Sequence, residues 1–164
     1  MDDRPDRQQR RELAAHLHPR TVLLHIGTND MYGSDPAGAP GRLSTLLDHI
    51  TATSPNTEVF VATIVPISFA DSTVRTFNAA IPGIVQSKVN AGKRVHLVDM
   101  YRALTTADLA DGVHPNAGGY SKMANVWYSA LLSVPGSMDG RGPARTGRAS
   151  YQEATTDGSH WGSR

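Results

Sequence analysis

Residues 21–30 read TVLLHIGTND, a short apolar run that ends in a glycine and three polar residues. The apolar part, TVLLHIG, shows no alternation of apolar and polar positions. This pattern predicts a strand over 21–27 that is buried on both faces, as strands of parallel sheets usually are. Two later runs share the pattern and complete the set of predicted strands: TEVFVATIV at 57–65 and RVHLVDM at 94–100.

Segments with the composition and spacing of helices lie before, between and after these strands. Residues 7–17 are good helix formers, and residues 42–52 and 117–132 each carry an apolar helical face. A further helix is predicted over 71–91, with a kink or a restart at Pro82. The order αβαβαβα requires parallel strands joined by right-handed crossovers. The predicted fold class is therefore α/β, with three layers and a parallel sheet flanked by helices.

Length and composition predict one domain with a real core. The chain has 164 residues, of which 39% are hydrophobic. Gly, Ser, Arg and Thr dominate from Ser133 onward, so we predict a domain over 1–134 and a disordered tail or linker over 135–164.

The charge balance and the missing cysteine exclude several classes of function. Sixteen basic and fifteen acidic residues give a formal charge of +1, which offers no case for a nucleic-acid or membrane partner. No run of about 18 apolar residues predicts a membrane span. The absence of cysteine excludes disulfides, thiolate nucleophiles and zinc–sulfur sites. The first residues, MDDRPDRQQRRE, show no signal peptide, and the compartment stays open.

Polar residues follow the first and third predicted strands. Thr28, Asn29 and Asp30 come directly after the first, and the segment DGVHPNAGG at 111–119 comes shortly after the third. Because ligands of open parallel sheets bind beyond the carboxyl ends of the strands, we expect these groups to gather at one edge of the sheet.

The residue types at this edge suit acyl-transfer chemistry. His114 is the natural general base, because its reference pKa lies near 6.5, and Asp111 can accept the other ring N–H and orient the imidazole. Asn29 can donate an amide N–H to an oxyanion. Gly27 allows close approach of backbone and ligand, and Asn116 is predicted to cap the last helix.

Five blocks in this order resemble the SGNH (GDSL-type) hydrolases: IGTND, ATIVP, FNAAIPGIV, VHLVDMYRAL and LADGVHPNAGGYSKMA. The sequence is most similar to the acetyl-xylan-esterase-like branch, the third carbohydrate esterase family, over roughly residues 10–132. The resemblance implies a flavodoxin-like fold. It assigns the triad's acid and base to Asp111 and His114, the oxyanion donor to Asn29 and a structural hydrogen-bonding role to Asp30.

The activity implied by the resemblance is hydrolysis of a carboxylic ester, such as an acetyl group on xylan. No metal or organic cofactor is implied, and secretion is suggested. The family's nucleophilic serine, in a GDS block at the end of its first strand, has no counterpart, because no serine here follows Gly-Asp. The resemblance therefore implies a fold truncated by its first two strands and a chain that is weak or inactive alone. Residues 21–27 would form an exposed edge strand, open to self-association.

Alternatives stay open at this point. The chain could be a non-catalytic relic or a carbohydrate-binding module, or a second polypeptide or upstream segment could supply the GDS strand. Asp111 and His114 could be a hydrogen-bonded loop pair. A metal site at Asp30, Asp111 and His114 is disfavoured because no i, i+4 histidine pair supports it. We expect His25 to be a satisfied core histidine, and three aromatic or apolar positions of the last helix to be core: Tyr120, Met123 and Trp127.

Overall fold

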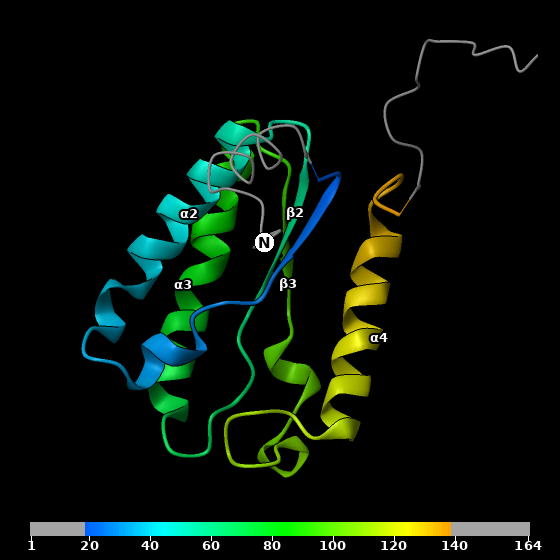
Figure 1. Cartoon of the computed structure of the whole chain (residues 1–164). Helices are drawn as coiled ribbons and strands as arrows, with labels where there is room; N and C mark the ends of the chain where they lie inside the picture. The colour runs from blue at the N-terminus through cyan, green and yellow to red at the C-terminus, as the bar shows by residue number, and fades with distance from the viewer. Residues whose placement is uncertain (1–18, 139–164) are drawn as a thin grey trace, which may run out of the picture.

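The computed structural model describes residues 19–138, which form a three-layer α/β domain. Helices α2 and α3 cover one face of the sheet and α4 covers the other (Figure 1). This arrangement confirms the predicted fold class. The elements are β1 (Thr21–Leu24), α2 (Ala39–Thr53), β2 (Glu58–Ala62), α3 (Asp71–Asn90), β3 (Val95–Val98) and α4 (Ala117–Ser133).

The sheet is parallel, with the strand order β1-β2-β3. Its central strand β2 is buried on both faces, as the sequence predicted. Val59 and Val61 pack into the core beneath α2 and α3, whereas Phe60 and Ala62 pack into the core beneath α4. Alternating side chains thus serve two separate cores.

The edge strand β1 differs from the sequence prediction. It has four residues rather than seven, and Leu23 is 44% exposed. Val22 and Leu24 pack against the core beneath α2 and α3, but the core beneath α4 contains no β1 residue. The prediction of burial on both faces is therefore wrong for this strand, because α4 covers only the other two strands.

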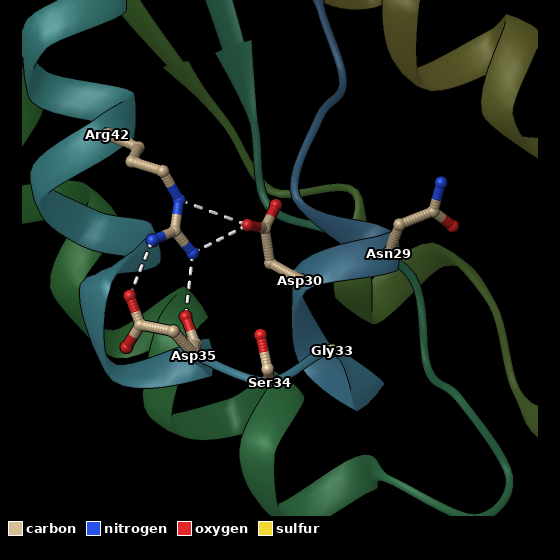
Figure 2. Close-up of a pocket in the computed structure, with 6 residues that line it drawn as sticks. All are labelled: Asn29, Asp30, Gly33, Ser34, Asp35 and Arg42. Carbon is tan, nitrogen blue, oxygen red and sulfur yellow. Dashed lines mark hydrogen bonds and ion pairs between the residues drawn. The ribbon is translucent and has the colours of Figure 1, made fainter.

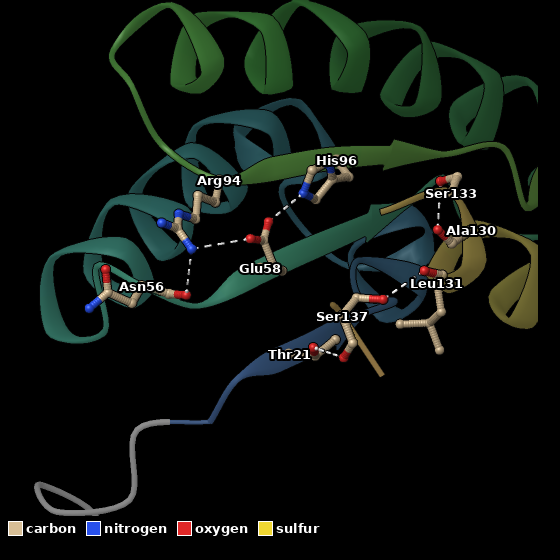
Figure 3. Close-up of polar contacts among 9 residues, drawn as sticks. All are labelled: Thr21, Asn56, Glu58, Arg94, His96, Ala130, Leu131, Ser133 and Ser137. Carbon is tan, nitrogen blue, oxygen red and sulfur yellow. Dashed lines mark hydrogen bonds and ion pairs between the residues drawn. The ribbon is translucent and has the colours of Figure 1, made fainter. Parts of the chain in front are cut away.

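Polar contacts fix the amino ends of β2 and β3 (Figure 3). Glu58 on β2 bonds to His96 on β3 at 2.7 Å and to Arg94 at 3.3 Å. Beyond the end of α4, Ser137 accepts a hydrogen bond on its carbonyl from the Thr21 hydroxyl at 2.7 Å. Ser137, near the start of the predicted tail, therefore contacts β1, and the tail from residue 139 onward lies outside the described residues.

The helix α3 runs unbroken through Pro82, so the expected restart is not present. Burial of Val74, Phe77 and Ile81 along one side holds the helix on the sheet and offsets the hydrogen bond that proline cannot donate. The helix predicted over 7–17 lies outside the described residues. None of the helices between residues 19 and 138 combines the length and apolarity needed to cross a membrane.

Two polar side chains fix the chain just beyond the carboxyl ends of β2 and β3. The buried Asn78 amide on α3 bonds to both the N–H and the carbonyl of Ile64, at 2.9 and 2.8 Å. The Thr63 hydroxyl accepts from the backbone N–H groups of Met100 and Tyr101, each at 2.9 Å. The segments that carry the candidate site therefore start from fixed positions.

Candidate active site

The loop from Asp108 to Asn116, between β3 and α4, is closed on itself by backbone hydrogen bonds. The Ala110 N–H donates to the His114 carbonyl at 2.7 Å, and the Asn116 N–H donates to the Asp108 carbonyl at 2.8 Å. Val113 packs against the core beneath α2 and α3. The 108–116 loop is thus held by both hydrogen bonds and burial, although it contains no long regular element.

Asp111 and His114 are directly bonded within this loop. Asp111 Oδ2 lies 2.7 Å from His114 Nδ1. The other carboxylate oxygen accepts the backbone N–H groups of Val113 at 3.0 Å and His114 at 2.7 Å. The carboxylate is therefore fixed at three points, and the ring nitrogen left for proton transfer is Nε2.

The same contacts set the charge state of Asp111. The backbone N–H of His114, then its ring, then the backbone N–H of Val113 hold the pKa of this carboxyl far below its usual range. Asp111 is consequently a carboxylate at any ordinary pH. A permanent carboxylate on Nδ1 favours the tautomer that carries its proton there, which leaves Nε2 able to act as a base.

The helix α4 is docked tightly behind this loop. Asn116 stands at its N-cap, where Oδ1 accepts from the Gly119 N–H at 2.9 Å. A Cβ atom on Gly119 would lie 2.5 Å from the Asp108 carbonyl, so only glycine fits this contact. Lys122 adds an ion pair to Asp108 at 2.7 Å. The loop and the helix therefore form one packed unit.

Asn29 lies on the short 3₁₀ turn η1 (Thr28–Tyr32) that follows β1. Its side chain is exposed, and its Oδ1 accepts a hydrogen bond from the Tyr32 hydroxyl at 2.5 Å. Because the amide oxygen is bonded in this way, the NH₂ group is left as a donor. Gly27 precedes the turn with a φ of 113°, and a Cβ there would lie 2.8 Å from the Phe77 ring. Gly27 thus has a packing reason to be glycine beside the predicted role toward a ligand.

Asp30 points to the opposite side of this turn from Asn29 (Figure 2). The guanidinium of Arg42 on α2 bonds to Asp30 at 2.6 Å and to Asp35 at 2.7 Å. This ion-pair cluster fixes the chain after η1 and borders a polar cavity of about 310 Å³. The residues lining the cavity are Asn29, Asp30, Gly33, Ser34, Asp35 and Arg42.

The two groups of predicted site residues do not bond to each other, but a chain of contacts connects them. From the Asn29 side, Tyr32 contacts Phe69, with ring centroids 5.7 Å apart. From the Asp111 side, the Gly112 carbonyl accepts from the Ser68 N–H at 2.9 Å. Ser68 and Phe69 are neighbours in the segment after β2. The segments that follow β1, β2 and β3 are therefore in contact at the carboxyl edge of the sheet.

Sequence reasoning missed Tyr32, Ser68, Phe69 and Arg42. A signal existed for Tyr32, because it follows Asn29 by three residues and any helical turn there would place it on the same side. No comparable signal marks Phe69, whose position depends on how the segment after β2 meets η1. Among the predicted core positions of α4, Met123 is buried and Trp127 packs beneath the helix, but Tyr120 is 55% exposed, which corrects that part of the prediction.

Within residues 19–138, no serine hydroxyl bonds to the His114 ring, and no three His, Asp or Glu side chains are grouped as metal ligands would be. His25, expected to be a satisfied core histidine, is mostly buried, yet its Nε2 has no hydrogen-bond partner in that part of the chain. The described residues thus hold a bonded imidazole–carboxylate pair and an exposed amide donor at one edge of the sheet.

Ligands of open parallel sheets bind at this edge, and a bonded Asp–His pair is two thirds of the triad found in many hydrolytic enzymes. A family model described as GDSL-like lipase/acylhydrolase matches residues 2–122. The chain belongs to this family, which the sequence resemblance had indicated.

Solved carbohydrate esterases share both sequence and fold with the chain. It is 36% identical to a family 3 carbohydrate esterase from Clostridium thermocellum, with a TM-score of 0.61, over 70% of this chain and 57% of that one. It is 32% identical to a family 3 carbohydrate esterase from Talaromyces cellulolyticus, with a TM-score of 0.66. That match covers 73% of this chain and 60% of the esterase.

A curated protein from Acetivibrio thermocellus, which carries a provisional endoglucanase X name, is 39% identical over 127 residues. That match covers 76% of this chain and 55% of the relative. The chain therefore spans little more than half the length of this relative and of the two solved esterases.

Proposed function

We propose that the chain carries the base, acid and oxyanion-donor part of an ester hydrolase that removes acetyl groups from a polysaccharide such as xylan. The observation that carries this proposal is the 2.7 Å bond between His114 Nδ1 and Asp111 Oδ2, in a carboxylate that two backbone N–H groups also hold. A loop pair needed only for packing would not require an exposed imidazole, and the His114 side chain is 70% exposed.

In the proposed reaction, a serine hydroxyl attacks the ester carbonyl while His114 Nε2 takes its proton. The Asn29 amide donates to the oxyanion that forms. His114 then returns the proton to the alkoxide that leaves, and the acyl group stays on the serine. Water, deprotonated by the same ring, releases the acid and regenerates the serine. Asp111 stabilises the imidazolium at both stages.

The serine in this proposal comes from outside the described residues. It would be supplied by another segment or polypeptide whose strand pairs with the edge of β1 that has no strand neighbour within residues 19–138, where Leu23 is exposed. Loss of the nucleophile alone costs about 10⁶ in turnover in a well-studied triad enzyme, so we expect the chain by itself to have little activity. The same edge is the proposed site of self-association.

The substrate class rests on the relatives, because the similar structures are named family 3 carbohydrate esterases and a 33% identical one is named an acetyl esterase. The polar lining of the cavity at Asn29, Asp30 and Arg42 also suits a hydroxyl-rich alcohol better than a fatty acyl chain.

Turnover of p-nitrophenyl acetate tests the proposal. The full chain is assayed alone and with a fragment of a related SGNH hydrolase that contains the GDS block. We expect little turnover alone and a clear gain with the fragment. His114→Ala should lower the turnover measured with the fragment by at least about 10³-fold, and Asn29→Ala should lower it by about 10²–10³-fold. The matched control is His49→Ala, which changes an exposed histidine on α2 and should have no effect.

Two outcomes would contradict parts of this proposal. Turnover by the chain alone, with a fluorophosphonate label on one of its serines, would show that the nucleophile is present. A gain in turnover that His114→Ala leaves intact would remove His114 from the reaction.

The second candidate function is a carbohydrate-binding module without catalysis. It is favoured by the observation that no serine hydroxyl in residues 19–138 bonds to His114. Binding to acetylated xylan without turnover, whether or not the fragment is added, would support it.

A further inference from the structure

We infer that Tyr32 and Phe69 form a subsite that stacks against a sugar ring of the substrate, an inference that rests on the proposed polysaccharide ester as substrate. Phe69 is 67% exposed and Tyr32 is 47% exposed. Single exposed apolar residues are common on protein surfaces, whereas exposed rings that contact one another are a more informative sign of a binding site. Here two of them contact each other at the edge that carries the candidate active site.

Hydrogen bonds hold the Tyr32 hydroxyl and the backbone on both sides of Phe69, while both rings stay exposed. The Tyr32 hydroxyl is fixed by its bond to Asn29. Phe69 stands in a short turn whose flanking residues are tied by two backbone bonds: Ser68 N–H to the Gly112 carbonyl at 2.9 Å, and Ala70 N–H to the Ile67 carbonyl at 3.2 Å. A pair held in this way is available for binding with little loss of conformational freedom.

The contacts of the pair place it between the two halves of the candidate site. Tyr32 bonds directly to the proposed oxyanion donor, and the neighbour of Phe69 bonds to the residue that follows Asp111. An ester carbonyl at Asn29 would therefore have its alcohol portion within reach of the rings.

The shape and surroundings of the pair fit a pyranose. The ring planes are tilted by 57°, so one ring can meet the C–H face of a sugar while the other meets its edge. Exposed aromatic faces of this kind match the C–H face of a carbohydrate, whereas a long acyl chain would need an enclosed apolar groove.

The test is a ¹H–¹⁵N NMR titration of the full chain with xylohexaose, which needs no catalysis. We expect shifts concentrated at residues 29–34 and 67–70. Phe69→Ala should weaken binding roughly three- to tenfold, in line with the usual worth of one aromatic contact. Tyr32→Phe keeps the ring and should bind within about twofold of the native chain, whereas Tyr32→Ala should resemble Phe69→Ala. The control is Tyr128→Ala, on an α4 tyrosine that is 58% exposed.

The outcomes separate this inference from the proposed function. Binding that Phe69→Ala and Tyr32→Ala leave unchanged, or no binding at all, would overturn the subsite whatever the esterase assay shows. Ring-dependent binding in a chain whose complemented form never turns over ester would keep the subsite and overturn the proposed reaction. Because Phe69 is exposed, its variants should fold. Phe69→Leu, which retains apolar volume without an aromatic face, provides a second variant with the same expected loss.

Discussion

The 108–116 loop and the strand β1 with its following turn carry the two halves of the candidate site, and they are held in different ways. The loop is irregular, but its hydrogen bonds close on themselves and α4 packs directly behind it. The strand is regular, but it forms the edge of the sheet, and Leu23 and Ile26 are 44% and 46% exposed.

This difference indicates that the Asp111–His114 loop finds its bonding partners locally, whereas the proposed oxyanion donor follows a strand that has one strand neighbour within residues 19–138. Judged by regular secondary structure alone, β1 would be expected to be held more firmly than the loop. How firmly each segment is held depends instead on whether its backbone polar groups and apolar side chains have partners. Substitutions on the two sides should therefore behave differently.

The largest effect is expected in the loop, at its contact with α4. Gly119→Ala places a methyl group 2.5 Å from the Asp108 carbonyl and should lower the free energy of unfolding by about 1–3 kcal/mol. The neighbouring Gly118→Ala is the matched control, because its nearest contact is a side-chain oxygen at 3.3 Å. It should be neutral or stabilise by up to about 1 kcal/mol, since alanine favours helix. The measurement is the free energy of unfolding in urea. Equal changes in Gly119→Ala and Gly118→Ala would contradict the tight packing of the loop against α4.

A smaller effect, dependent on pH, is expected at the end of β1. Burial lowers the pKa of His25 below its ordinary value of 6.5. Between the two pKa values the unfolded chain binds the extra proton and the folded chain does not, so stability should fall as the pH drops below about 6.5.

His25→Leu should flatten this part of the stability curve, measured by urea denaturation between pH 5 and pH 8. His49→Leu, which changes an exposed histidine, is the control. An unchanged slope in His25→Leu would show that this histidine is not held neutral by burial.

The smallest effect on stability, and a separate effect on association, is expected at the β1 edge. Leu23→Lys should change stability by less than about 0.5 kcal/mol, as exposed positions usually do. It should also reduce self-association in sedimentation equilibrium, because a charged edge resists pairing. Leu97→Lys on β3 is the control, with the same 44% exposure. Because β3 is the other edge of the described sheet, equal reductions by both variants would show that the association is not specific to the β1 edge.

Much of the fold could be predicted from sequence because the strands and helices follow periodic patterns. The three strands and the helices near 42–52, 71–91 and 117–132 are present, with ends shifted by a few residues. The burial of β1 could not be predicted from its own composition. TVLLHIG has the composition of an interior strand, whereas the family resemblance implied an exposed edge strand, and the position of α4 over the other strands leaves one face of β1 uncovered.

The site was predictable where its residues are close in sequence. The spacing of Asp111 and His114 suffices for a bonded pair, and Asn116 lies at the start of a recognisable helix. Phe69 and Arg42 were missed because their contacts join different segments of the chain, whereas Tyr32 had a local signal in its spacing from Asn29. Their positions depend on how η1, α2 and the segment after β2 meet in space.

The central claim is that Asp111 holds His114 with its proton on Nδ1 and leaves Nε2 as the base. Nitrogen-15 NMR of the imidazole reads this tautomer directly in the full chain, without any need for catalysis. The account predicts a proton on Nδ1 and a free lone pair on Nε2 in the neutral ring, with a loss of this preference in Asp111→Asn. A neutral ring protonated on Nε2, or a tautomer that Asp111→Asn leaves unchanged, would contradict it.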